Sequence, residues 1–390
     1  MEIISLKALI CKEFGPIENL ELADIDDPKP GSDEVTIRVS AAGINFPDNL
    51  IVEGKYQFKP TFPFSPGAEA AGKIIATGDK VTDFKVGQKV IAMPGHGCFA
   101  EIVKSPQTKL IPITDDVVDL KIASILPMAY GTSAHALIQR GKLKKNETLL
   151  VHGAAGGVGL AAVDLGNYFG ANVIATSASS KKREFLKTYG AQHVLPDKGF
   201  KDKVKELTSG SGADIIYDPV GGDVFDESVR CIGWNGRLLI IGFTSGRIPS
   251  VNVNMPLIKG FSVVGVRGGE YGRRDPEKGK KNLESIDKCL EMGPNYNKQY
   301  WETDINLEST SSSDIENNRY EVLEYWGTID AMTAREQGLA IDPDIEDSTQ
   351  VQVNVWTSRG KIIRLVENPF QPFRIPYQAF AYEKNPYNFF

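Results

Sequence analysis

The sequence contains few cysteines and no long hydrophobic run. Its four cysteines are Cys11, Cys98, Cys231 and Cys289, and no two of them have the short spacing of a thiolate metal site. This scatter predicts neither a disulfide framework nor a thiolate zinc cluster, and we interpret all four as reduced packing residues. No apolar stretch approaches the ~20 residues that span a bilayer, and no secretory leader pattern is present. We therefore expect a cytoplasmic, soluble protein without a membrane span.

An excess of basic charge is also lacking. The formal net charge is −6, from 50 acidic and 44 basic residues. Residues 294–390 hold 15 of the acidic and 8 of the basic residues, a net charge of −7, which leaves +1 for residues 1–293. Neither part has the strongly basic balance that a nucleic-acid partner requires.

Two patterns of secondary structure follow each other along the chain. From Leu6 to about Val118, short β-branched runs broken by glycine and proline predict a compact, largely antiparallel domain. After Ile122 the pattern is helical around an interruption at Pro127, and from Thr148 strands and helices alternate. This alternation predicts right-handed βαβ units in a doubly wound parallel sheet, so the fold class is α/β. The predicted strands are Thr148–His152, Val173–Thr176, His193–Leu195, Ile215–Tyr217, Arg237–Ile241 and Ser262–Val266, and the predicted helices begin near Gly157, Lys181, Lys201 and Val224.

The glycine-rich stretch after the first of these strands predicts a nucleotide-binding turn. In "TLLVHGAAGGVG" a buried type of strand leads through glycines into a helix, which is the context that makes such a motif specific. Glycines let the turn close tightly, and the free amides and the helix dipole attract a pyrophosphate. We expect Gly156, Gly157 and Val158 to bind it, because a side chain at either glycine would push the phosphate away. The alternative is a tight strand-to-helix crossover without a ligand.

The end of the next strand indicates which dinucleotide binds. An NAD site places an acidic residue there, but this chain has Ser177, followed by Lys181, Lys182 and Arg183. Hydroxyls and cations favour a 2′-phosphate, so we expect NADPH as the cofactor, bound by Ser177 and Lys182. The alternative is an ordinary solvated first turn of a helix.

Motifs across residues 6–292 carry a family resemblance. They include "AAGINFPDNLIVEGKY", "FPFSPGAEAAGKI", "GDKVTDFKVGQKVIAM", "LPMAYGTSAHAL", "HGAAGGVG", "YDPVGG" and "NMPLIKGFSVVGV". This part of the chain resembles the zinc-free quinone oxidoreductase branch of the medium-chain dehydrogenase/reductase superfamily, to which zeta-crystallin belongs. The resemblance implies a GroES-like catalytic domain over residues 1–123, a Rossmann NADP-binding domain over 124–266 with the cofactor in the cleft between them, and a truncated return to the catalytic domain over 267–293.

Two positions indicate whether this chain could bind the zinc ion of its zinc-dependent relatives. Zinc-dependent relatives carry a cysteine where this chain has Asn45 and a histidine where it has Ala68. Neither side chain here is a zinc ligand, so we expect no metal. Hydride transfer then depends on alignment with an electron-poor acceptor and on hydrogen bonds to the developing oxyanion, which favours quinones and α,β-unsaturated carbonyls as small-molecule substrates.

The resemblance also implies site residues. Asn45 and Tyr56 are the candidates at the nicotinamide and substrate end, with Tyr56 at the position of a proton-donating tyrosine in related enoyl reductases. The alternatives are a turn role for Asn45 and, for Tyr56, an entrance position with water as the proton donor. Thr132 matches a position beside the nicotinamide or else packs a helix, and Gly242 and Phe243 lie in a loop that the family uses for the cofactor.

Other polar residues are less specific. Arg267 and Tyr271 face either the substrate or solvent, and the solvated reading is favoured. The dispersed histidines, His96, His135, His152 and His193, are interpreted as structural. The family often forms homodimers through an edge strand, and "FSVVGV" after Phe261 offers one.

Residues 294–390 depart from the pattern. This acidic segment holds 15 of the 35 aromatic residues, and "VQVNVWTSRGKIIRLVEN" predicts a hairpin around Ser358–Gly360. From about Tyr300 to Phe390 the segment resembles a fragment of a short-tailed phage portal protein, and no DNA-packaging activity carries over. Two readings stay open: a reductase with an altered C-terminus, or a catalytically impaired chimeric binding protein whose tail mediates assembly.

Overall fold

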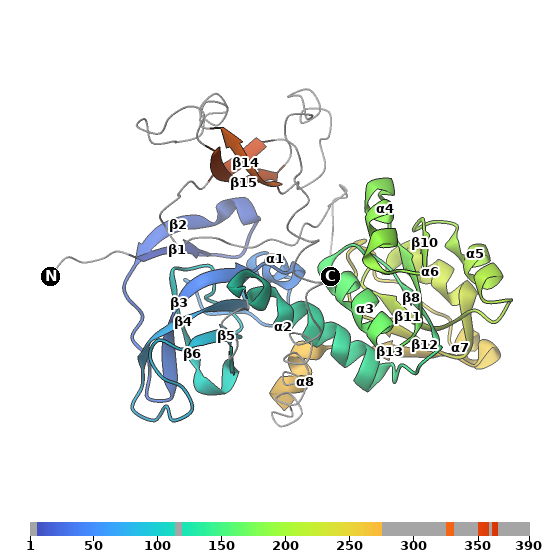
Figure 1. Cartoon of the computed structure of the whole chain (residues 1–390), viewed down its shortest axis with the longest axis horizontal. Coiled ribbons are helices and arrows are strands. Elements are labelled where there is room, and N and C mark those ends of the chain that lie inside the picture. Colours follow the sequence, from blue (N-terminus) through green and yellow to red (C-terminus); the bar gives the residue numbers. More distant parts are fainter. Residues whose placement is uncertain (1–5, 114–118, 275–324, 331–349, 359–360, 366–390) are drawn as a thin grey trace. The chain divides into compact units, whose positions relative to one another are not determined.

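The computed structural model describes residues 6–113, 119–274, 325–330, 350–358 and 361–365. The chain divides into two compact units between Ile125 and Leu126. Figure 1 shows residues 6–125 in blue to blue-green and residues 126–274 in green to orange-yellow. Each unit has its own hydrophobic core.

The first unit is built from antiparallel strands. Strands β1 (Leu6–Ile10) and β2 (Glu21–Ile25) form one pair. A five-stranded sheet has the order β6 (Ile102–Pro106), β3 (Glu34–Gly43), β4 (Glu69–Thr77), β5 (Lys89–Ala92) and β7 (Leu110–Pro112). Val35, Ile37, Ile74 and Val90 are almost fully buried on it. The predicted antiparallel β-rich domain is confirmed, and a short helix, α1 (Phe46–Val52), follows β3.

A long helix spans the division between the units. Helix α2 (Leu120–Ala134) continues through Pro127, so the predicted interruption is wrong. Proline removes one backbone hydrogen bond, but Ala123, Leu126 and Ala129 are buried, and this packing holds the helix together. A π-helix, η3 (His135–Arg140), follows directly.

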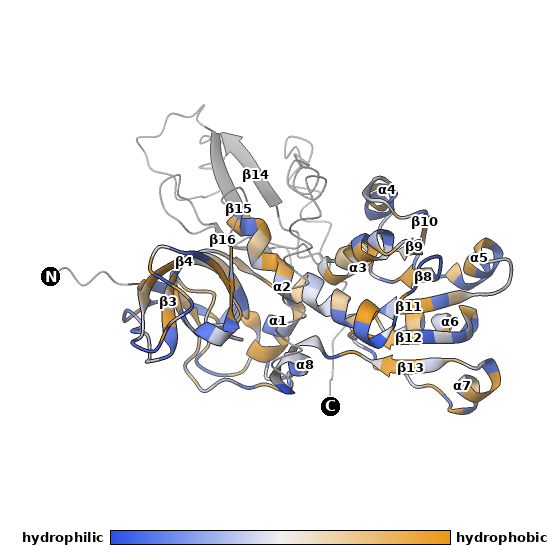
Figure 2. Cartoon of the chain, turned by 60° about the horizontal axis from the view of Figure 1, so that its bottom comes forward, coloured by the Kyte–Doolittle hydropathy of each residue, from blue (hydrophilic) through white to orange (hydrophobic). Residues whose placement is uncertain are grey.

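The second unit is a doubly wound parallel sheet. The strand order is β10 (His193–Leu195), β9 (Asn172–Thr176), β8 (Thr148–Val151), β11 (Ala213–Asp218), β12 (Ile232–Ile240) and β13 (Ser262–Gly265). Its helices are α3 (Gly157–Tyr168), α4 (Ser180–Tyr189), α5 (Phe200–Leu207), α6 (Gly222–Cys231), α7 (Asn254–Lys259) and α8 (Gly268–Arg274). The chain winds outward from β8 in one direction and from β11 in the other, so α3 and α6 cover opposite faces, as Figure 2 shows.

Burial explains why these strands are readable from sequence. Leu149, Leu150, Ile215, Ile216 and Leu238 have no exposed surface, as expected for parallel strands covered on both faces. The predicted strands agree with the observed ones to within a few residues, apart from the start of β12, which begins at Ile232. The predicted α/β fold is therefore confirmed.

A small antiparallel sheet lies beyond the gap after Arg274. Its order is β14 (Tyr325–Asp330), β15 (Gln350–Ser358) and β16 (Lys361–Leu365). Ser358 pairs with Lys361, so the two strands of the predicted hairpin are confirmed. The rest of the acidic segment lies outside the described residues.

Three of the cysteines can be assessed. Cys11, Cys98 and Cys231 are buried free thiols, which confirms their packing role, and Cys289 lies outside the described residues. None of the helices in the described residues has the length and the apolar composition that a membrane span requires.

Candidate functional site

The glycine turn connects β8 to α3. Gly156 is the N-cap of α3, and its amide donates to the carbonyl of Gly153 at 2.9 Å, which closes the turn. The first amides of a helix have no intrahelical acceptor, so the turn presents donors at the positive end of the α3 dipole. The local chemistry is that of an anion site.

Two glycines of this turn have separate steric tasks. Gly153 has a φ of +53°, a conformation that side chains disfavour. A Cβ on Gly159 would lie 2.3 Å from the carbonyl oxygen of Gly153 and 2.8 Å from the Cα of Ala154. Only glycine at this position lets α3 approach the end of β8 so closely. The fit of the turn to a dinucleotide pyrophosphate therefore rests on its donors and on this packing.

The turn lies where the winding direction reverses, between β8 and β11. A Cβ on Gly153 would be 3.3 Å from Val220 and 3.4 Å from Pro219, in the loop that follows β11. Ligands of open parallel sheets bind at such a switch point, at the carboxyl ends of the strands.

The loop after β12 joins the same edge of the sheet. Thr244 and Ser245 donate their amides to the carbonyls of Pro219 and Val220, at 3.0 and 2.9 Å. A Cβ on Gly221 would meet the ring of Phe243 at 2.9 Å. Gly242 and Phe243 therefore lie in a loop hydrogen-bonded to the one beside the glycine turn.

A buried carboxyl lies at the end of β11. Oδ1 of Asp218 accepts the amides of Val220 and Gly221 at 2.8 and 2.9 Å. Burial raises the pKa of Asp218 to about 6, and the two amides oppose this rise. Within the described residues its Oδ2 has no hydrogen-bond partner. Asp218 lies in the motif "YDPVGG", but the sequence alone predicts no role for it.

The end of β9 carries the predicted 2′-phosphate residues. Ser177 is buried, and its amide donates to the carbonyl of Leu195 at 3.2 Å. Helix α4 begins one residue before the predicted start and is capped by Ser179, whose hydroxyl accepts the amide of Lys182 at 3.3 Å. The guanidinium of Arg183 donates to the carbonyls of Ser177 and Ala178, at 2.8 and 2.6 Å. Arg183 therefore holds the loop, while Lys181 is exposed and Lys182 is half-buried.

Thr132 is tied to the glycine turn through its neighbour. The hydroxyl of Ser133 donates to the carbonyl of Val158 at 2.8 Å and lies 2.9 Å from the hydroxyl of Tyr217. Ser133 and Tyr217 have no exposed surface. Burial raises the pKa of the Tyr217 phenol, so it stays neutral and can share this hydrogen bond. One hydroxyl thus links α2, the first turn of α3 and β11.

The first unit holds Asn45 in a buried polar cluster. Asn45 is the N-cap of α1, and its Nδ2 donates to Oε1 of Glu69, at the start of β4, at 2.7 Å. Its backbone amide donates to Oδ2 of Asp48 at 2.8 Å. Glu69 has no exposed surface, and Asp48 is 4% exposed. These two carboxyl groups fix the side chain and the backbone of Asn45.

Burial controls ionisation in this cluster. It raises the pKa of Asp48 to about 7, although the amides of Asn45, Ala68 and Gly67 favour the carboxylate. The pKa of the Cys98 thiol is raised well above its usual value by burial, and further by Asp48 and Glu69. Cys98 is therefore an unreactive thiol.

Tyr56 lies at the other end of α1. The helix has seven residues, so its ends are about 10 Å apart. Tyr56 is partly buried against the cluster of Cys11, Ile51, Val52 and Phe64, and its amide donates to the carbonyl of Leu50 at 3.1 Å. The structure does not bring Asn45 and Tyr56 side by side along this helix.

The predicted site residues thus fall into two groups. Thr132, the glycine turn, Ser177, Lys182 and the Gly242–Phe243 loop belong to the second unit, and Asn45 and Tyr56 belong to the first. Their roles stay predictions. Among the described residues, no group of three or more histidine, cysteine, aspartate or glutamate side chains could hold a metal ion.

Comparison with known proteins identifies the family. The sequence model of the alcohol dehydrogenase GroES-like domain matches residues 31–115, and that of the zinc-binding dehydrogenase matches residues 157–286. A quinone oxidoreductase-like protein 2 homolog from Nematostella vectensis is 40% identical over 296 residues, which cover 75% of this chain and 79% of that protein. The chain belongs to the medium-chain dehydrogenase/reductase superfamily.

Solved structures of quinone oxidoreductases have a similar fold. Pseudomonas syringae quinone oxidoreductase is 30% identical, with a TM-score of 0.69 over 74% of this chain and 89% of that one. Escherichia coli quinone oxidoreductase, solved in complex with NADPH, is 25% identical, with a TM-score of 0.66 over 73% and 86%. The chain is an oxidoreductase of this superfamily with a nicotinamide cofactor. None of these matches bears on the portal-protein resemblance of residues 300–390, which stays a prediction.

Proposed function

We propose that the protein is a zinc-independent reductase that uses NADPH to reduce a quinone or an α,β-unsaturated carbonyl. The observation that carries the proposal is the glycine turn at the switch point, with Gly159 packed against Gly153. The likeness to quinone oxidoreductases, one of them bound to NADPH, supports the reaction and the cofactor.

The chain offers suitable groups for each part of this cofactor. The amides of Gly156, Gly157 and Val158 would bind the pyrophosphate, and Ser177 with Lys182 would bind the 2′-phosphate. No carboxylate follows β9 directly to repel that phosphate. Thr132 and the Gly242–Phe243 loop would line the path toward the nicotinamide. When bound, NADPH supplies the hydride.

Asn45 and Tyr56 would act on the acceptor. The amide group of Asn45, held by Glu69, is preorganised to hydrogen-bond the nicotinamide or the acceptor oxygen, where negative charge develops. The phenol of Tyr56 would donate a proton to the reduced acceptor. Neither Asn45 nor Ala68 supplies a zinc ligand, so oxyanion stabilisation would come from hydrogen bonds.

The test is binding followed by turnover. We expect the protein to quench NADPH fluorescence and to oxidise NADPH with 1,4-benzoquinone or an enone. Lys182→Glu should weaken NADPH binding about tenfold or more while changing NADH binding little, because only NADPH carries the 2′-phosphate. Lys187→Glu, at the exposed far end of α4, is the matched control. NADPH left unchanged by a panel of quinones and enones would overturn the proposal and favour the impaired binding protein.

A homodimer is part of the same proposal. Strand β13 is at the edge of the six-stranded sheet, and Val263 on it is 40% exposed. Val253, Leu257 and Ile258, in the segment before β13, and Trp234, whose ring lies beside Gly260, are 68% to 86% exposed. Helix α7 is partly orange in Figure 2. An open edge strand beside exposed apolar side chains suits pairing with a second copy.

A further inference from the structure

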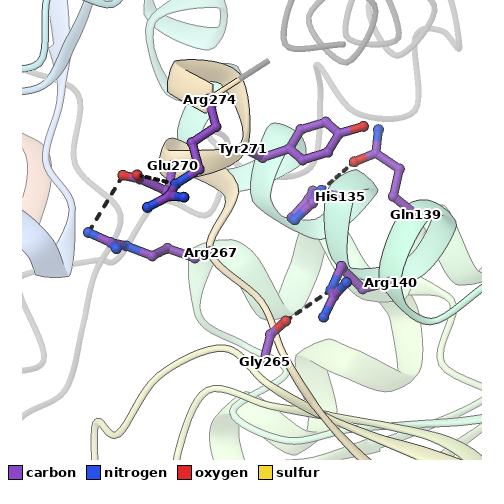
Figure 3. A pocket seen from close by; sticks show the side chains of 8 residues that line it. All are labelled: His135, Gln139, Arg140, Gly265, Arg267, Glu270, Tyr271 and Arg274. Atoms are coloured by element: carbon purple, nitrogen blue, oxygen red, sulfur yellow. Dashed lines mark hydrogen bonds and ion pairs between the residues drawn. The ribbon is translucent and has the colours of Figure 1, made fainter. Parts of the chain in front are cut away.

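A cavity of about 450 Å³ opens within the second unit, outside the glycine turn. Figure 3 shows its lining, which comes from η3 on one side and from residues 265–274 on the other. Each segment contributes arginine, and each contributes one ring, from His135 and from Tyr271. The sequence favours a solvated role for Arg267 and Tyr271 over a substrate role, whereas the structure places both in the wall of this cavity.

Among the described residues, the lining of the cavity is positively charged. Arg140, Arg267 and Arg274 line it together with one described carboxylate, Glu270, so these four groups carry a net charge of +2. Glu270 is shared, with Oε1 2.9 Å from Nε of Arg274 and Oε2 3.7 Å from Nη2 of Arg267. Arg140 uses its Nε to donate to the carbonyl of Gly265 at 3.0 Å, which anchors its guanidinium beside β13. A single carboxylate therefore positions two guanidinium groups without neutralising all three.

The two rings form an apolar wall beside these cations. The centroids of His135 and Tyr271 are 4.4 Å apart with an interplanar angle of 36°. Nδ1 of His135 is hydrogen-bonded to the side chain of Gln139. Burial lowers the pKa of His135 below 6.5, the hydrogen bond to Gln139 opposes this, and Arg140 lowers the pKa further, so the neutral imidazole predominates at pH 7. The cavity thus combines aromatic faces with guanidinium donors.

The cavity adjoins the residue proposed for the nicotinamide. A Cβ on Gly268, at the start of α8, would lie 3.5 Å from the Cα of Thr132 and 3.6 Å from its hydroxyl. His135 follows Thr132 by three residues, and positions three apart lie on the same side of a helix. A molecule reacting beside Thr132 could therefore extend into the cavity.

We propose that this cavity binds the anionic end, a carboxylate or phosphate group, of an acceptor whose reducible part lies beside Thr132. This inference rests on the proposed function and adds an acceptor class to it. Guanidinium groups match the two oxygens of a carboxylate or phosphate, and the His135–Tyr271 pair suits the apolar body that joins this anion to the reducible carbonyl.

Matched acceptors test the proposal. Benzylideneacetone and its para-carboxylate and para-phosphate derivatives have the same reducible enone and differ in the remote charge. We expect the wild-type protein to show a KM for one of the anionic forms about tenfold or more below that for the neutral form. The double variant Arg267→Gln, Arg274→Gln should remove most of this preference, measured as the ratio of the two KM values. Arg230→Gln, an exposed arginine of α6, is the control that keeps the ratio.

A binding measurement separates this inference from the proposed function. The saturated analogue 4-(4-carboxyphenyl)butan-2-one and its phosphate counterpart cannot accept a hydride at a double bond, so titration calorimetry reports binding without turnover. Binding that weakens in the double variant and with added salt supports the pocket even if NADPH is never oxidised. Equal KM values for neutral and anionic enones, or equal binding by wild type and double variant, would overturn it. The better bound of the two anions identifies the group.

Discussion

At the scale of single residues, His152 shows how burial sets a pH dependence. Its ring nitrogens lie 2.9 Å from the hydroxyl of Thr176 and 2.8 Å from that of Ser228, and it has no exposed surface. Burial lowers its pKa from 6.5 to about 3. Between pH 6.5 and 3, His152 is protonated in the unfolded chain but not in the folded one. The free energy of unfolding therefore falls as the pH drops from 6.5 toward 3.

We expect His152→Gln to remove this pH dependence of the unfolding free energy. Glutamine can still hydrogen-bond with both hydroxyls but does not titrate. Between pH 6.5 and 4, His152 should contribute a slope of about 1.4 kcal/mol of unfolding free energy per pH unit, and the variant should lack it. Urea unfolding at several pH values measures the slope, with His193→Gln, an exposed histidine, as the control. An identical slope in wild type and His152→Gln would contradict the assignment.

Glu69 yields a second residue-scale prediction, because it positions Asn45. Glu69→Ala removes the acceptor of the Asn45 Nδ2 donor, and we expect kcat for NADPH oxidation to fall about tenfold as the amide loses its orientation. Glu69→Gln keeps an acceptor oxygen and should retain much of the kcat that Glu69→Ala loses. A general loss of folding would lower kcat in both variants, and circular dichroism would detect it. A difference in kcat between two folded variants therefore tests whether Glu69 positions Asn45.

Residues of this kind mark the limit of what the sequence can predict. The glycine turn was predictable because its strand, glycines and helix are adjacent in the chain. The partners of Ser133 and His152 lie 84 and 76 residues away, at Tyr217 and Ser228, so no local pattern reveals them. The structural interpretation of His152 is confirmed by its buried hydrogen bonds, whereas His135 lines a cavity, which the sequence did not indicate.

At the scale of elements, the contact between α3 and β8 depends on Gly159. A Cβ there would lie 2.3 Å from the carbonyl oxygen of Gly153, so Gly159→Ala must shift the helix or the turn. We expect a loss of about 1–3 kcal/mol in unfolding free energy and a weaker affinity for NADPH by about tenfold or more. Thermal unfolding and fluorescence titration measure the two effects. Tyr168→Ala, at an exposed position on the same helix, is the control, and an affinity of Gly159→Ala equal to that of the wild type would contradict the prediction.

The elements differ in how clearly the sequence encodes them. Parallel strands covered on both faces are continuous apolar runs, and β8, β9 and β11 were predictable for this reason. The π-helix η3 was not, because a change of hydrogen-bond register leaves no mark in the spacing of apolar residues. Helix α2 continues through Pro127 because tertiary packing outweighs a local preference.

At the scale of the whole molecule, the edge of the large sheet carries the proposed dimer interface. We expect Val263→Lys to convert a dimer into a monomer, since a lysine on an edge strand disfavours pairing with another edge. Sedimentation equilibrium measures the mass, and Tyr168→Lys, an exposed position on α3, serves as the control. A wild-type monomer, or a dimer that persists in Val263→Lys, would contradict the proposed interface.

The separation of α3 from α4 has an evolutionary consequence. The turn that would bind the diphosphate precedes α3, whereas the cations that would bind the 2′-phosphate lie at the start of α4. Arg183 of α4 donates hydrogen bonds to the loop before that helix. Descendants of this protein could change their preference between NADPH and NADH by altering Ser177 and Lys182. Such a change of cofactor would leave the diphosphate-binding turn, which both coenzymes need, unaltered.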